Sequence, residues 1–385
     1  MDIVTGNIVK GDDLYGRDYE LDLLWKTVEK DSLLLTSPRR YGKTSVVKAM
    51  EDNPRAGWSV IYVDMEGSSD PPEFVAELSK RVSTTPLQKT RNLFRSARDA
   101  TDELHLPGLV GVKLREPDVS WKEDGTEIFC ELKKSSPKSI VIIDELPTYL
   151  LAMQEKYGDG GSTISAFLHW LRRIRQDLQI RFVVCGSIGI DTIVDKYRLE
   201  NSVNDFARLQ LLPFDDETAK GMITTLLDRY GIGHTDDLVK EIMESIGLQV
   251  PFFIQLMLKE IRDRTDFGRK DLTSEIISDS YWKGLLGAEG KKDFAWYFER
   301  LRTEFRGNDH RAALEILHLL ARVPGAPEAE LAEIHSEITQ RDDEPGFRRI
   351  LHVLETGFYI ARSDAGITFH NKVLRDLWIQ EGGAR

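Results

Sequence analysis

Two kinds of hydrophobic pattern alternate over the first part of the chain. Short apolar runs bounded by glycine, proline or polar clusters are typical of buried strands. These runs occupy 31–36, 58–67, 139–146, 180–187 and 209–214. Between them, apolar residues recur at helical spacing in 20–30, 45–50, 72–83 and 164–178. Strands that alternate with helices predict an α/β fold, in which helices cover both faces of a parallel sheet.

Beyond this alternating region the patterns predict two further parts. Helical spacing alone fills 214–305, so we expect a helical lid subdomain there, after a core at 1–213. In 306–385, three helical segments precede two short β runs, which is the order of elements in a winged-helix domain. The stretch 84–136 is charged and interrupted by prolines, and we interpret it as an insertion or connecting arm of the core.

The composition is that of a globular protein with more than one domain. Its 385 residues are 41% hydrophobic and 30% charged, which is enough for a core and more than one core usually holds. A net charge of −12 argues against a protein whose whole surface binds nucleic acid, although a local basic patch is compatible with this charge.

Cysteine usage and hydropathy predict where the protein works. The two cysteines, Cys130 and Cys185, form neither a disulfide framework nor a zinc-binding spacing, so we expect a reducing compartment. No signal core and no run of about 18 apolar residues is found, so a cytoplasmic protein without a membrane partner is expected.

Residues 37–44 (SPRRYGKT) carry the clearest chemical signal. They lie between a predicted strand and a predicted helix and match the phosphate-loop pattern GxxxxGK[ST], except that Ser37 replaces the first glycine. In such a loop, backbone N–H groups, a lysine and a hydroxyl bind phosphates and Mg²⁺. We assign nucleotide binding to Ser37, Pro38, Arg39, Arg40, Tyr41, Gly42, Lys43, Thr44 and Ser45. Ser37 is compatible with this role if its φ is negative, and the alternative is a capped helix after a Ser-Pro turn.

Asp144 and Glu145 complete the predicted site at the end of the run 139–146. An acidic residue at the end of a buried strand supports Mg²⁺ in phosphate-loop proteins, and an adjacent glutamate activates water. We therefore assign the metal to Thr44 and Asp144, general-base catalysis to Glu145, and ATP with Mg²⁺ as cofactors. The alternative is a helix N-terminus that carries acidic residues.

Three motifs resemble the archaeal-type ATPase family, a branch of the AAA+-related and STAND-like P-loop ATPases. They are LYGRDYE at 14–20, SPRRYGKTS at 37–45 and IIDELP at 142–147, and the likeness extends to FHNKVLRDLW at 369–378. The resemblance implies a P-loop core, a helical lid and a C-terminal winged helix. It also implies that Tyr15, Gly16 and Arg17 contact the adenine side of the nucleotide. An ordinary helix start is the alternative for these three residues.

The resemblance implies two further catalytic residues. Ser187 corresponds to the polar sensor that orients the attacking water, and Arg208, with Arg198 in reserve, to an arginine finger that reaches a neighbouring subunit. A turn residue and a surface ion pair are the respective alternatives. GLQVPFFIQ at 247–255 resembles the lid of STAND-like proteins more than the arginine-bearing sensor of AAA+ remodelling motors.

These features favour a slow Mg²⁺-dependent ATPase that acts as a nucleotide-controlled switch for a protein or DNA partner. The alternatives are an oligomeric DNA-loading or DNA-remodelling AAA+ ATPase and a nucleotide-stabilised module without turnover. The third tail helix carries Phe347, Arg348, Arg349 and His352, which on a winged helix are placed to face a DNA groove. From residue 310 onwards, however, nine Lys/Arg stand against twelve Asp/Glu, which favours docking of a protein or an autoinhibitory role.

Overall fold

The computed structural model describes residues 1–5, 8–9, 11–84, 121–186, 190–197, 199–341 and 343–382. Internal contacts divide the chain into two units. The sheet unit comprises Arg17–Ser37 and Lys43–Leu211, and the helical unit comprises Met1–Gly16, Pro38–Gly42 and Leu212–Arg385. Among the described residues, no helix is both long enough and apolar enough to span a membrane.

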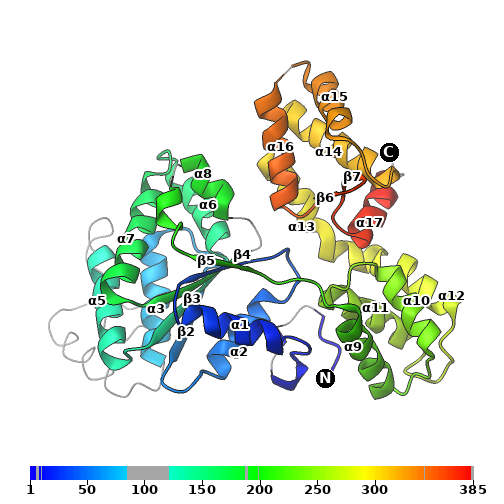
Figure 1. Ribbon diagram of the computed structural model, residues 1–385, viewed down its shortest axis with the longest axis horizontal. Helices are drawn as coiled ribbons and strands as arrows, with labels where there is room; N and C mark the ends of the chain where they lie inside the picture. The colour runs from blue at the N-terminus through cyan, green and yellow to red at the C-terminus, as the bar shows by residue number, and fades with distance from the viewer. Residues whose placement is uncertain are drawn as a thin grey trace. The chain divides into compact units, whose positions relative to one another are not determined.

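The sheet unit is built on a five-stranded parallel sheet in the order β2-β3-β4-β1-β5 (Figure 1). The strands are β1 (Leu33–Thr36), β2 (Ser59–Asp64), β3 (Ser139–Asp144), β4 (Arg181–Gly186) and β5 (Ala207–Gln210). Every residue of β3 is buried, which explains why the central strands read as continuous apolar runs rather than alternating ones. The predicted α/β fold with a parallel sheet is confirmed.

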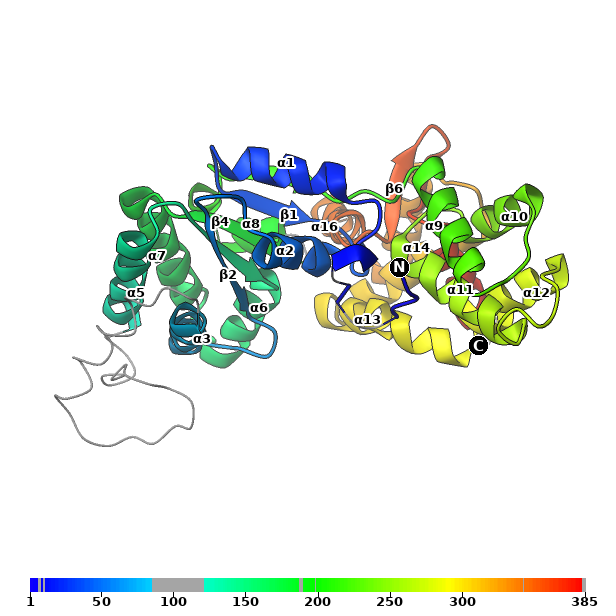
Figure 2. The same ribbon diagram turned by 90° about the horizontal axis from the view of Figure 1, so that it is seen from below.

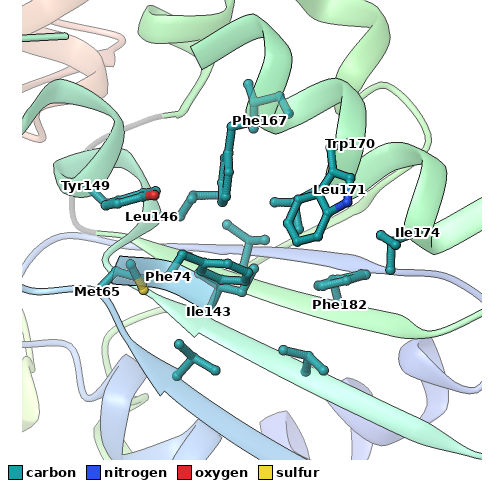
Figure 3. Close-up of a cluster of buried hydrophobic side chains, with 14 of the residues drawn as sticks. Met65, Phe74, Ile143, Leu146, Tyr149, Phe167, Trp170, Leu171, Ile174 and Phe182 are labelled. Atoms are coloured by element: carbon teal, nitrogen blue, oxygen red, sulfur yellow. The ribbon is translucent and has the colours of Figure 1, made fainter. Parts of the chain in front are cut away.

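Helices cover both faces of this sheet (Figures 1 and 2). One face carries α1 (Asp18–Val28) and α2 (Lys43–Asp52). The other carries α3 (Pro71–Thr84), α5 (Trp121–Ser135), α6 (Leu146–Tyr157), α7 (Ser162–Leu178) and α8 (Ile190–Tyr197), and the short turn η2 (Glu200–Ser202) follows. On this second face, Phe74 packs edge to face against both Phe167 and Trp170, and the Phe74 and Phe167 ring centroids lie 5.2 Å apart (Figure 3).

Helix α5 occupies 121–135, within the segment 84–136 that we interpreted as an insertion or connecting arm. One side of α5 is buried in the core of the sheet unit, through Trp121, Gly125, Ile128, Phe129 and Leu132. A β-carbon at Gly125 would lie 2.6 Å from the ring of Trp170, so glycine allows these helices to approach. Residues 121–135 therefore belong to the packed core, 85–120 lies outside the described residues, and the assignment of 84–136 as an insertion or connecting arm stays a prediction.

The helical unit contains the short turn η1 (Gly11–Asp13) near the start of the chain. Beyond residue 212 a series of helices follows (Figure 2). They are α9 (Asp216–Arg229), α10 (Asp236–Ile246), α11 (Pro251–Arg264), α12 (Ser274–Asp279), the π-helical turn η3 (Ser280–Leu285) and α13 (Ala288–Glu304). Their starts follow known capping chemistry. The carboxylate of Asp215 accepts the N–H of Thr218 at 2.7 Å, and Pro251 occupies the first turn of α11.

The C-terminal elements follow the order expected of a winged helix. They are α14 (Gly307–Arg322), α15 (Glu328–Thr339), α16 (Glu344–Thr356), β6 (Ile360–Ser363), β7 (Gly366–Phe369) and α17 (Lys372–Gly382). β6 and β7 pair antiparallel, and Ala326 bridges to Ile367, which ties the chain before α15 to the hairpin. The last helix, α17, is an addition to the predicted order.

Candidate functional site

The phosphate-loop motif leaves β1 through Ser37, which is fully buried. The Ser37 hydroxyl accepts the N–H of Leu211 at 2.7 Å and lies 2.9 Å from the carbonyl oxygen of the same residue. Ser37 is not among the residues with positive φ, so the condition for replacing the first glycine is met. The hydroxyl thus links the start of the loop to Leu211, just beyond β5. A glycine at position 37 would have no side chain to make this link.

Farther along the loop, two residues adopt left-handed backbone conformations. Arg40 has a φ of 74° and Gly42 a φ of 90°. Glycine adopts this region freely, whereas a residue with a β-carbon does so only where its surroundings hold it. Left-handed residues within a turn are a feature of backbone nests that bind anions.

The start of α2 meets the end of β3 at the carboxyl edge of the sheet. The Thr44 hydroxyl donates to Asp144 Oδ2 at 2.8 Å, and Lys43 Nζ donates to the Ser37 carbonyl oxygen at 2.6 Å. Only β4 separates β1 from β3 in the sheet, so parallel strand ends bring these distant residues together. The structure thus places side by side the hydroxyl and the carboxylate that the motifs indicate for Mg²⁺.

The donor set fits Mg²⁺ bound together with phosphate. Mg²⁺ prefers oxygen ligands and commonly uses one or two carboxylates completed by phosphates and water. Thr44 and Asp144 offer such oxygens. Within the described part of the chain, no group of three or more His, Cys, Asp or Glu side chains is arranged to hold a metal ion. A nucleotide would therefore have to supply further ligands.

Tyr62, which the sequence analysis missed, is a second donor to the same carboxylate. Its buried hydroxyl lies 2.8 Å from Asp144 Oδ2. Burial, followed by the charge of Asp144, raises the pKa of Tyr62 far above its usual range, so the phenol stays protonated. The strand register carried the signal, because Tyr62 pairs with Ile142 and Asp144 lies two residues farther on the same face.

Glu145 occupies the turn between β3 and α6. Its φ of 55° is left-handed, its N–H donates to Asp144 Oδ1 at 3.1 Å, and its carboxylate accepts the Thr148 hydroxyl at 2.9 Å. The Glu145 side chain makes no capping hydrogen bond to α6. The role of Glu145 as general base and the alternative of a helix N-terminus that carries acidic residues both stay predictions.

The LYGRDYE motif divides between the two units. Tyr15 packs edge to face on Phe214, and a β-carbon at Gly16 (φ 64°) would lie 2.4 Å from the Thr218 methyl group. In the sheet unit, the buried Arg17 forms an ion pair with Glu20 in the first turn of α1. These contacts give the motif a structural role, and the adenine contact expected of Tyr15, Gly16 and Arg17 stays a prediction.

The remaining predicted catalytic residues differ in what the structure says of them. Arg208 is exposed on β5, which is an edge strand of the sheet. Ser187 and Arg198 lie outside the described residues. The finger and sensor assignments therefore stay predictions.

The third helix of the tail, α16, carries the four residues that the sequence analysis placed toward a DNA groove, and one of them is buried. Phe347 is buried and packs against His335, so its placement toward a DNA groove is wrong. Arg348, Arg349 and His352 are exposed. Arg348 pairs with Glu328 at 2.8 Å and with Glu344 at 3.4 Å, so acidic neighbours already neutralise part of this surface.

Comparison with solved structures agrees with the observed fold. A Walker-type ATPase of Pyrococcus abyssi is 18% identical, with 98% of this chain and 100% of that chain covered at a TM-score of 0.70. The ORC2 protein of Aeropyrum pernix in ADPNP–ADP complexes is 11% identical, with 100% and 98% covered at a TM-score of 0.60. No protein-family model and no curated protein matches the chain. At these identities the likeness establishes the fold alone, which is that of the AAA+ kind of P-loop NTPase.

Proposed function

We propose that the protein binds ATP with Mg²⁺ at the loop between β1 and α2 and hydrolyses it slowly. The observation that carries the proposal is the 2.8 Å contact between the Thr44 hydroxyl and Asp144 beside Lys43. Hydroxyl, carboxylate and lysine at the carboxyl edge of a parallel sheet are the groups that phosphate-loop chemistry requires. Two AAA+-fold neighbours, a Walker-type ATPase and an ORC2 protein with bound ADPNP and ADP, support the same reading.

Each residue of the site has a definite task in this mechanism. The Lys43 amine, now bonded to the Ser37 carbonyl oxygen, exchanges that partner for β- and γ-phosphate oxygens. Thr44 and Asp144 would hold Mg²⁺, and the ion would supply positive charge beside the transferred phosphoryl group. Glu145 accepts a proton from the attacking water, and its bond from Thr148 orients the carboxylate.

Two further residues complete the proposed chemistry. Ser187 orients the attacking water, as the resemblance to the archaeal-type ATPases implies. Arg208 stabilises the γ-phosphate of a neighbouring copy, for which its exposure on an edge strand is suitable.

The nucleotide state would then act as a switch. Loss of the γ-phosphate removes its contacts with Lys43 and with the loop, and such loss releases switch elements in other nucleotide-binding proteins. A protein partner is favoured over DNA, because Arg348 and Arg362 of the C-terminal elements both pair with Glu328 at 2.8 Å. Arginines held by carboxylates are poorly placed to release counterions from phosphates.

The second candidate is an oligomeric ATPase that loads or remodels DNA. The exposed Arg208 and the likeness to an ORC2 fold favour it. Both candidates share the same phosphate chemistry, so they differ in what stimulates turnover rather than in the site itself.

Steady-state ATP hydrolysis tests the proposal. It is measured against protein concentration, with and without duplex DNA, for wild type, Glu145→Gln and the exposed control Glu127→Gln. A slow rate per subunit that does not change with protein concentration or with DNA, and that is lost only in Glu145→Gln, supports the nucleotide-controlled switch. A rate that climbs with concentration and DNA supports the second candidate. Hydrolysis that survives Glu145→Gln contradicts the assigned base.

A further inference from the structure

Three consecutive residues at the tip of the phosphate loop contact distant elements of the helical unit. Arg40 Nη2 lies 3.0 Å from Asp293 Oδ1 on α13. The Tyr41 hydroxyl lies 3.3 Å from His370 Nε2 after β7, and the Arg39 guanidinium lies 5.8 Å from the centre of the Trp296 ring. Nucleotide chemistry at the loop does not by itself require any of these contacts.

Arg40 makes the most specific of the three contacts. Its guanidinium lies 4.4 Å from the centre of the Phe252 ring, while Asp293 holds Nη2. A planar guanidinium suits a site that combines an aromatic face with a carboxylate, and a lysine does not replace it there. Phe252 lies in the GLQVPFFIQ segment at the start of α11, so this segment has a contact of its own with the loop.

The surroundings leave Arg40 with little else to offset its charge. Its side chain is about one-third exposed, and its Nε is buried with no hydrogen-bond partner among the described residues. Loss of Asp293 would leave a half-buried guanidinium beside an aromatic ring and near Arg39. A partly buried charge without its partner is destabilised, so the side chain would leave its present place.

The backbone conformation of Arg40 connects the position of its side chain to phosphate binding. Its φ of 74° is one that a residue with a β-carbon keeps only where its surroundings enforce it. The conformation of the loop tip sets the direction of the N–H groups that would meet an anion. A displaced Arg40 side chain would therefore let the loop relax away from that conformation.

We propose that Asp293, together with Phe252, is a positioning residue for nucleotide binding. By holding the Arg40 side chain it keeps the loop tip in the conformation that receives phosphates. This inference rests on the proposed function and adds to it a residue more than 250 positions away in sequence. Occupancy of the loop is thereby linked to α11 and α13 through the Arg40 side chain.

Equilibrium binding of Mg²⁺-ADP, labelled with a fluorophore on the ribose, tests the inference. Thermal unfolding without nucleotide is measured in parallel. We expect Asp293→Asn to weaken binding by roughly 3- to 30-fold, since the pair is only partly buried. Asp293→Glu should recover part of the loss, and the exposed Glu299→Gln on the same helix should bind as wild type does.

A double-mutant cycle separates positioning from general damage. Arg40→Gly removes the side chain and permits the left-handed backbone, so Asp293→Asn should have no further effect on binding in that background. Arg40→Lys keeps the charge and loses the planar contact with Phe252. It should also weaken binding, and it tests the inference independently if Asp293→Asn does not fold.

The outcomes distinguish this inference from the proposed function. Binding that is unchanged in Asp293→Asn, or a lower unfolding temperature at unchanged affinity, overturns the positioning role while wild-type binding upholds the proposed function. Equal losses from Asp293→Asn in the wild-type and Arg40→Gly backgrounds also overturn it. Failure of wild type to bind the nucleotide overturns the proposed function, and the positioning role with it.

Discussion

Replacing Ser37 with the glycine that the phosphate-loop pattern prefers should destabilise this protein. The Ser37 hydroxyl is the acceptor for the buried N–H of Leu211 at 2.7 Å and lies within bonding distance of its carbonyl oxygen. Ser37→Gly removes the hydroxyl and frees the backbone at the same time. Ser37→Ala removes only the hydroxyl, so the two variants separate the two effects.

The expected magnitude follows from these contacts. A buried N–H that loses its partner costs about 1–3 kcal/mol. Glycine adds about 0.5–1 kcal/mol relative to alanine, because the unfolded chain gains conformational freedom. Ser37→Gly should therefore lower the free energy of unfolding by about 1.5–4 kcal/mol, and Ser37→Ala by about 1–3 kcal/mol.

Urea-induced unfolding followed by circular dichroism measures both variants. The exposed Ser162, at the start of α7, supplies the control. Ser162→Ala should stay within about 0.5 kcal/mol of wild type. A Ser37→Gly protein as stable as wild type would refute the reasoning, because the bond to Leu211 would then contribute nothing.

Three further substitutions test other contacts. Tyr62→Phe should lower the free energy of unfolding by about 1.5–3 kcal/mol and weaken Mg²⁺-ADP binding, because it removes a donor to the Asp144 carboxylate. Urea unfolding and binding calorimetry that are both unchanged would contradict this prediction. Gly16→Ala should lower stability by about 1–3 kcal/mol, since its φ is 64° and the new methyl group meets Thr218; an unaltered melting temperature would count against it. Phe347→Ala should cost about 3–5 kcal/mol as a core truncation, whereas a stable variant that only loses DNA binding would restore the groove-facing prediction.

Local sequence patterns predicted the parts of the fold and site that depend on neighbouring residues. The buried strands read as continuous apolar runs, and the loop between β1 and α2 has a fixed spacing of glycine, lysine and threonine. Because parallel strands end at one edge, the meeting of Thr44 with Asp144 followed from the predicted topology. The burial of Phe347 could also have been predicted, because Phe347 shares a helical face with Ile350, Leu351 and Leu354.

The parts that were missed depend on contacts between distant residues. The buried side of α5 includes Gly125, whose role becomes clear only from its close approach to Trp170. Tyr62 required the register of β2 against β3. The ion pair of Arg40 with Asp293 joins residues that are 253 positions apart, and no local period encodes such a pairing.

The most direct test of the central claim is the affinity for Mg²⁺-ATP measured by titration calorimetry in wild type and in Lys43→Ala. The account requires binding by wild type and a large loss in Lys43→Ala, because the Lys43 amine is the cation placed to meet the β- and γ-phosphates. A Lys26→Ala protein, altered at an exposed lysine of α1, serves as the control and should fold and retain binding. Equal ATP binding by wild type and Lys43→Ala would contradict the assignment of the loop as the nucleotide site.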